Sequence, residues 1–167
     1  GDDINKERAN TVQIMARFLY SELGNFQLAK MKGGNKKNAI ARDTEAVVYV
    51  KENDIEGFIS RFNAFAEDVR KEFHNTDPDV KFAAERTEFS GNAVDSEVAK
   101  RFIMALVAIN HGVLAMSQDI AGLVETSTNL AAVNMDTPGK IIVKTSQRSS
   151  SESGKKFVAD KVQATFH

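Results

Sequence analysis

Hydrophobic residues recur at helical spacing in four segments of the chain. In the segment 5–23 they return every three or four positions, and Gly24 follows as a helix-ending glycine. The next segment can be capped by Asn53. Its apolar stripe consists of Ile55, Phe58, Ile59, Phe62, Phe65, Ala66, Val69 and Phe73. A third helix is predicted for residues 92–109 and a fourth for residues 149–166.

Between these helices the apolar positions alternate as they do in strands. The predicted strands are residues 26–32, 44–50, about 80–87, about 123–134 and 140–147. Pro138 and Gly139 stand where a type II turn requires them, between the last two strands. Residues 111–121 are predicted to form a loop. The predicted order is therefore αββα, one central strand, and αββα again.

This order indicates an internal repeat. Each αββα copy becomes a ferredoxin-like βαββαβ-type unit when an outer strand is added. We therefore predict an α+β fold of two ferredoxin-like units in tandem, the first about 1–88 and the second about 79–167. The sheet is expected to be antiparallel with helices on one face, which leaves the other face and the hairpin loops free.

Composition narrows the class of protein. The 167 residues are 42% hydrophobic and suffice for one core, and the formal net charge of −1 argues against a general nucleic-acid binder. The absence of cysteine excludes a disulfide framework and thiolate metal sites. No apolar run approaches the roughly 20 residues of a membrane span, and the charged start GDDINKER has no signal-peptide pattern. Because the chain lacks an initiator methionine and ends within a predicted helix, we expect a fragment of a larger protein.

The connection between the first two strands is glycine-rich and strongly basic. Residues 33–50 begin with two glycines, and the cations around the amide of Asn38 are Lys30, Lys32, Lys36, Lys37 and Arg42. A hairpin needs the glycines but not this density of positive charge. The loop is either a cradle for an anionic group, such as a peptide carboxylate, or a solvated turn with solubilising lysines.

We find no complete catalytic motif in the chain. His74, His111 and His167 are too scattered for a metal cluster, and neither HExxH nor GxSxG occurs. The remaining candidates are polar residues on the hairpins. Asn38 and Asn129 occupy similar places in the two units. A side-chain amide there can donate to a carboxylate and accept from a peptide N–H, or it can make a local turn bond.

Two further residues are candidates for binding a substrate. Arg148 ends a predicted strand just before a helix, where its guanidinium can hold a carboxylate through two hydrogen bonds or form a surface ion pair. His111 precedes a glycine in a predicted loop. It can donate to a reacting carbonyl oxygen or serve as a local turn residue.

Four stretches of the chain resemble the Xaa-His dipeptidases, the aminoacyl-histidine or carnosinase-like enzymes of the dizinc exopeptidase superfamily. GDDINKERAN is similar to the continuation of that family's GGHSGDDI segment. FQLAKMKGGNKKNAIARDTEA is similar to its strand–loop–strand with the pattern GGxxxNAIPRE. The other two stretches are INHGVLAMSQDIAGLVETSTNLA and TSQRSSSESGK. The resemblance covers essentially the whole chain, with its motifs in order.

The resemblance implies that residues 1–167 form the lid, or dimerisation, domain of a zinc-dependent dipeptidase that hydrolyses Xaa-His dipeptides. The catalytic domain with its two zinc ions is then absent, so the fragment is expected to have no activity, no catalytic residue and no metal ligand. Its role is to bind the substrate's C-terminal carboxylate and to close the active site.

The family's lid residues carry over to this chain one by one. Asn38 takes the role of the lid asparagine and Arg148 that of the lid arginine, with Asn129 as the counterpart of Asn38 in the second unit. The family's lid histidine falls before residue 1. Ala41 stands where the family usually has proline, a departure that leaves Asn38 less rigidly presented.

The implied partners are a dipeptide substrate and the catalytic domain of the same protein, in the cytoplasm, with no nucleic acid and no membrane. A homodimer is left open. Two other functions remain as alternatives: a stand-alone module that self-associates through exposed sheet edges, and an anion- or RNA-binding ferredoxin-like module that uses the loop 33–42. We see no RNP-type aromatic residues on the predicted strands.

Overall fold

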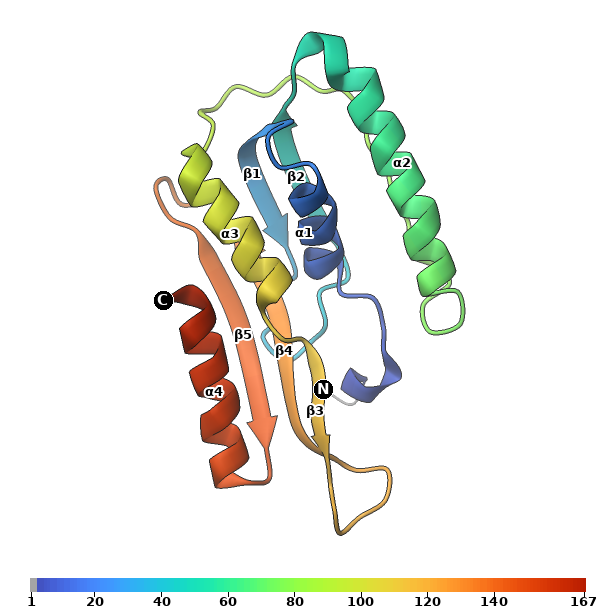
Figure 1. Ribbon diagram of the computed structural model, residues 1–167, viewed down its shortest axis with the longest axis vertical. Coiled ribbons are helices and arrows are strands. Elements are labelled where there is room, and N and C mark those ends of the chain that lie inside the picture. Colours follow the sequence, from blue (N-terminus) through green and yellow to red (C-terminus); the bar gives the residue numbers. More distant parts are fainter. Residues whose placement is uncertain (1–2) are drawn as a thin grey trace.

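The computed structural model describes residues 3–167, which form four α-helices, five β-strands and two 3₁₀ turns (Figure 1). In chain order the elements are η1 (Ile4–Lys6), α1 (Thr11–Ser21), β1 (Gln27–Gly33), β2 (Thr44–Tyr49), η2 (Glu52–Asp54), α2 (Ile55–Glu72), α3 (Ser96–Ala108), β3 (Gly112–Met116), β4 (Val124–Asn134), β5 (Ile142–Ser149) and α4 (Glu152–Phe166). Gly1 and Asp2, the start of the GDDI segment, lie outside the described residues. The α+β class is confirmed.

Strand β4 is the centre of a five-stranded sheet in which every pairing is antiparallel. Val133 pairs with Gly33 of β1 and also with Val143 of β5, so these two strands lie on opposite edges of β4. Strand β3 pairs with the first half of β4, on the same edge as β1, and β2 continues the sheet beyond β1. The edge shared by β1 and β3 is interrupted between Thr128 and Val133.

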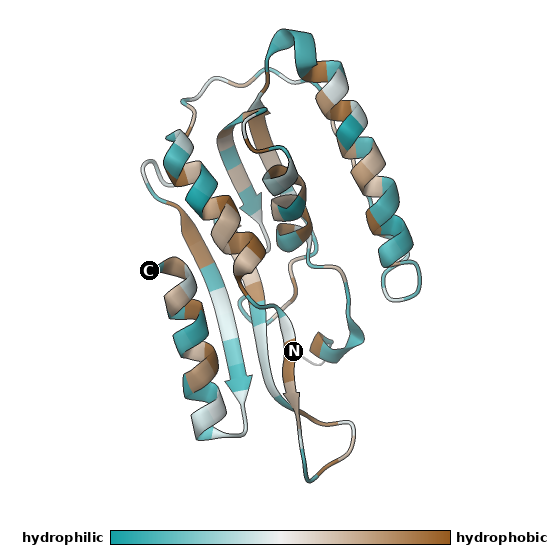
Figure 2. Ribbon diagram, viewed as in Figure 1, coloured by the Kyte–Doolittle hydropathy of each residue, from teal (hydrophilic) through white to brown (hydrophobic). Residues whose placement is uncertain are grey.

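The helices cover one face of this sheet, as predicted. Figure 1 shows α1 and α3 lying across it, while α4 packs against β4 and β5 and α2 packs beside α1. The aromatic stripe of α2 meets Phe18 of α1, whose ring centroid lies 5.3 Å from that of Phe58 and 5.0 Å from that of Phe62. Figure 2 shows the alternation of hydrophobic and hydrophilic residues along α2 that this packing requires.

Helix α1 is shorter than the predicted segment 5–23. The helix begins at Thr11 because the side chain of Asn10 caps it, accepting a hydrogen bond from the Gln13 backbone N–H at 3.1 Å. Residues 4–6 form a separate 3₁₀ turn. This break brings the segment before α1 close to β3 and β4.

The central strand predicted at about 80–87 is not formed. Residues 81–90 have no regular secondary structure, although Phe82 still turns inward and packs on Phe62 with ring centroids 6.2 Å apart. Downstream, the Val94 backbone N–H donates to the Leu28 carbonyl at 2.7 Å. The alternating apolar residues are therefore used for packing against α2, and no neighbouring strand pairs with them.

A strand forms where a loop was predicted. Residues 111–121 contain β3, whose apolar sequence GVLAM pairs with the first half of β4. The αββα order recurs as α1-β1-β2-α2 and, with β3 inserted, as α3-β4-β5-α4. The division into units of about 1–88 and 79–167 stays a prediction.

Candidate ligand-binding site

The basic β1–β2 connection does not project into solvent as a simple hairpin turn. It crosses the edge of β4, where Asn129 donates from Nδ2 to the carbonyl oxygens of Lys37, at 3.3 Å, and Ala39, at 2.8 Å. Further along, the Thr11 backbone N–H donates to the carbonyl of the buried Ala41 at 3.0 Å. These bonds fix the segment that carries Asn38, although the proline of the family pattern is absent.

Polar side chains gather on the sheet face that the helices leave uncovered. Leu130 of β4 belongs to the helix-covered core, and successive residues of a strand point to opposite faces. Ser127 and Asn129 therefore point away from the helices. Their partners across the ladder are Arg148 and Ser146 of β5, respectively. Figure 2 shows β5 changing from hydrophobic at its start to hydrophilic at its end.

These side chains and the crossing loop enclose a cavity of about 180 Å³. The polar residues that line it are Asp3, Arg8, Lys37, Asn38, Arg42, Ser127, Asn129, Ser146 and Arg148. Three of the four predicted site residues, Asn38, Asn129 and Arg148, are thus brought together. Cavities that hold a whole drug-sized ligand measure roughly 300–1,000 Å³, so this one fits the end of a ligand.

Asn129 has a different hydrogen-bonding role from the one predicted. Its side chain is 8% exposed, and its NH₂ group is already bonded to the two loop carbonyls. The buried Oδ1 atom has no hydrogen-bond partner among the described residues. Asn129 therefore holds the loop that carries Asn38.

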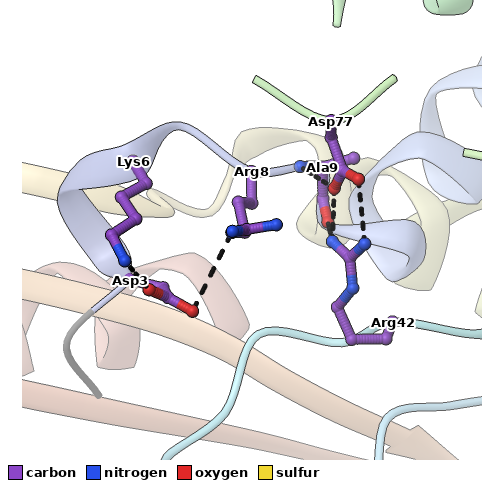
Figure 3. Close-up of polar contacts among 6 residues, drawn as sticks. All are labelled: Asp3, Lys6, Arg8, Ala9, Arg42 and Asp77. Carbon is purple, nitrogen blue, oxygen red and sulfur yellow. Dashed lines mark hydrogen bonds and ion pairs between the residues drawn. The ribbon is translucent and has the colours of Figure 1, made fainter. Parts of the chain in front are cut away.

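Arg42 lines the cavity, but its charge is used within the fold (Figure 3). Its Nη2 donates to Asp77 Oδ1 at 2.9 Å, and its Nη1 bonds Asp77 Oδ2. The Ala9 backbone N–H donates to the same Oδ2 at 3.1 Å. The hydrogen bonds from Arg42 hold the pKa of the Asp77 carboxyl below its ordinary value. This cluster ties the crossing loop to the segments before α1 and after α2.

The two lysines of β1 lie away from the cavity. Lys30 and Lys32 both form ion pairs with Asp136, in the turn between β4 and β5. Lys37 is the one lysine among the described residues that line the cavity. Of the cations that suggested an anion cradle, Lys37 and Arg42 therefore reach this site.

His111 lies outside this cavity and completes the interrupted edge of β4. Its Nδ1 accepts from the Leu130 backbone N–H at 3.2 Å, and it lies 3.2 Å from Nδ2 of Asn10. Nδ2 of Asn10 in turn donates to the Leu130 carbonyl at 2.8 Å. The side chains of His111 and Asn10 thus bond the backbone N–H and carbonyl of Leu130, which a neighbouring strand would otherwise bond. His111 also lines an adjoining cavity of about 350 Å³ beside η1 and α1, which shares Arg8 with the first cavity.

Burial lowers the pKa of His111 to about 4. Because Nδ1 accepts the Leu130 N–H, the neutral ring carries its proton on Nε2. We expect the His111 ring resonances in an NMR titration to stay constant from about pH 8 to about pH 5.5. Since the folded pKa is below the ordinary 6.5, the free energy of unfolding should fall as the pH drops from about 6.5 towards 4. A midpoint near 6.5 for this ring would contradict the observed bonding.

Neither a metal cluster nor a membrane span is found in residues 3–167. No group of three or more His, Asp or Glu side chains in that range is arranged to hold a metal ion. None of the helices described there is both long enough and apolar enough to cross a membrane. What this part of the chain offers is a small polar cavity on an open sheet face.

Comparison with known proteins shows that the chain is similar to peptide-cleaving enzymes, the dipeptidases. It is 27% identical to the cytosol non-specific dipeptidase of Escherichia coli K12 over 160 residues. These residues are 95% of this chain and 33% of that relative. The crystal structure of aminoacylhistidine dipeptidase from Vibrio alginolyticus matches with a TM-score of 0.93 and 28% identity, over 98% of this chain and 34% of that one. No protein-family model matches.

The resemblance to the aminoacyl-histidine dipeptidases is confirmed by these matches. The chain spans about a third of the length of the dipeptidases it matches.

Proposed function

We propose that this chain is the lid domain of a cytoplasmic, metal-dependent dipeptidase that hydrolyses Xaa-His dipeptides. The observation that carries the proposal is the cavity that joins Asn38, Asn129 and Arg148 from two hairpins far apart in the sequence. In this proposal the cavity binds the free C-terminal carboxylate of the substrate. Its size suits one end of a dipeptide, with the scissile bond outside it.

Arg148 supplies the main attraction for the carboxylate. It lies at the end of β5, is exposed, and forms no ion pair within residues 3–167, so its guanidinium can meet a carboxylate through two hydrogen bonds. Asn38 donates from the crossing loop, and the hydroxyls of Ser127 and Ser146 line the same wall. Since Asn129 fixes the loop, the donors are arranged before the ligand arrives.

The hydrolytic chemistry is assigned to a catalytic domain outside this chain. There, two zinc ions supply the Lewis acid and the activated water. In this proposal the residues of this chain bind and orient the substrate and exclude water when the domains close. Contact between this domain and its own catalytic domain, and the formation of a homodimer, belong to the same proposal.

Replacing Arg148 with alanine in the full-length enzyme is expected to lower kcat/KM for Xaa-His dipeptides by about tenfold or more. The reason is that hydrogen bonds to a charged group contribute about 1.5–3 kcal/mol. The measurement is steady-state kinetics on the purified enzyme. Lys144→Ala is the matched control, because Lys144 lies four residues away on β5 and does not line the cavity. Unchanged kinetics in Arg148→Ala would remove this residue from the site.

A further inference from the structure

The cavity carries more positive charge than one carboxylate requires. Its lining includes Arg8, Lys37, Arg42 and Arg148, and one carboxylate, that of Asp3, among the described residues. The charge of Arg42 is balanced by the buried Asp77, which is 4% exposed. Three cations therefore face the single carboxylate of Asp3. The excess of about two positive charges matches a ligand that bears two negative charges.

Arg8 makes one long ion pair within the described residues. Its Nε lies 3.8 Å from Asp3 Oδ2, beyond hydrogen-bonding distance. Asp3 already has a closer partner, since Nζ of Lys6 lies 2.6 Å from its Oδ1. Figure 3 shows Arg8 between Asp3 and the Arg42–Asp77 pair, joined by a dashed line to Asp3 alone. A guanidinium has five N–H donors, so most of those of Arg8 are available to a ligand.

Arg8 and Arg148 reach the cavity from different parts of the fold. Arg8 belongs to the segment between η1 and α1, whereas Arg148 lies at the end of β5. The cavity of about 180 Å³ therefore has one guanidinium from each of these two segments. This arrangement suits a short ligand with a carboxylate at both ends.

We propose that the cavity recognises a dicarboxylate, the end of a peptide whose C-terminal residue is aspartate or glutamate. Arg148 and Asn38 bind the main-chain carboxylate, and Arg8 binds the side-chain carboxylate and so determines specificity. The inference rests on the proposed function, because Arg148 must first hold the main-chain group. It adds peptides that end in an acidic residue to the Xaa-His dipeptides of the proposed function.

Binding of N-acetylglutamate and N-acetylglutamine to this chain tests the proposal, because the two ligands have the same shape and differ in side-chain charge. Titration calorimetry at low ionic strength, where exposed charges are least screened, measures both affinities. We expect N-acetylglutamate to bind about tenfold more tightly, or better, as one added charge-assisted contact implies. N-acetylhistidine should bind no more tightly than N-acetylglutamine.

Two variants separate the contributions of the arginines. Arg8→Gln should abolish the preference for N-acetylglutamate, because it weakens binding of that ligand about tenfold more than binding of N-acetylglutamine, while Arg8→Lys should retain part of the preference. Arg148→Ala should weaken both ligands alike. Arg101→Gln, on α3 and outside the cavity, is the control for a loss of general positive charge.

The outcomes distinguish this inference from the proposed function. Equal affinity of the wild-type chain for both ligands, or an Arg8→Gln variant that weakens both equally, would overturn the dicarboxylate proposal and leave the Arg148 site intact. A wild-type chain that binds neither ligand would overturn the carboxylate site itself. Circular dichroism of each variant shows that the fold is retained.

Discussion

Replacing Gly34 with alanine is expected to lower the free energy of unfolding by roughly 3 kcal/mol and to abolish ligand binding in the cavity. Gly34 has φ = +65°, and a Cβ atom there would lie 2.0 Å from the Ala131 carbonyl oxygen of β4. The obstructing atom belongs to the backbone of the central strand, so no side-chain rotation can relieve the clash. The crossing loop would have to leave β4 and break the bonds that Asn129 makes to it.

Gly24→Ala is the matched control for this prediction. Gly24 also has a positive φ, +92°, but nothing lies within 4 Å of the added Cβ. It should therefore show only the backbone strain of about 1 kcal/mol. Urea denaturation gives the free energy of unfolding of both variants. The difference between their losses is the contribution of the close contact between the loop and β4. Equal losses in the two variants would mean that the close approach of Gly34 to β4 contributes nothing.

Replacing Asp77 with asparagine is expected to destabilise the fold by about 2–3 kcal/mol. The variant leaves the Arg42 guanidinium without its counter-charge and weakens the bond from the Ala9 backbone N–H. The expected loss of stability is smaller than for a fully buried ion pair, because the Arg42 side chain is 48% exposed and partly solvated. The measurement is again urea denaturation, at pH 7.

The pH dependence gives this prediction a second readout. Arg42 lowers the pKa of Asp77 below its ordinary value of 3.8. The carboxylate therefore contributes its full stabilisation at pH values above 3.8, and this contribution is lost as the pH falls through the pKa of the folded state. The difference in the free energy of unfolding between wild type and Asp77→Asn should therefore disappear at low pH. Glu52→Gln is the control, because the Glu52–Arg86 pair is solvated and its loss should go undetected. If this difference in the free energy of unfolding persists at low pH, the loss of stability comes from packing and not from the charge of Asp77.

Local patterns of sequence predicted the helices well because each depends on neighbouring residues. The predicted stripe of α2 includes Phe58, Phe62, Ala66 and Val69, the residues of that helix that are buried. The last two strands also lie close to their predicted ranges. Periodicity of apolar residues is read within one element, so it requires no knowledge of what packs against that element.

The misassigned segments are those whose structure depends on distant partners. GVLAM forms β3 because the first half of β4 is free to pair with it, and residues 80–87 form no strand because α2 takes their apolar side chains. The Arg42–Asp77 pair joins residues 35 positions apart, and Arg42 by itself reads as one more loop cation. No local pattern distinguishes a structural arginine from a ligand-binding one.

The candidate site was predicted in part. Repeat order and family resemblance together pointed to Asn38, Asn129 and Arg148, which line one cavity. His111 was also expected to bind the substrate. It lines the adjoining cavity and bonds the edge of β4, and its role towards a substrate stays a prediction. Arg8 was not among the predicted site residues because it stands in the segment 5–23, which was predicted to be helical, whereas α1 begins only at Thr11. Its basic charge next to the GDDI motif was the one available signal.

The crossing loop also has a consequence for the order of folding. Hairpins β1–β2 and β4–β5 are built from contacts close in sequence, but they are joined to each other by the single pair Gly33–Val133 and by bonds such as that from Asn129 to Ala39, 90 residues apart. Contacts that close so long a segment form late because of their entropic cost. The cavity is therefore expected to be completed at the end of folding and to open first in the native state, so a ligand that fills it would hold the two hairpins together.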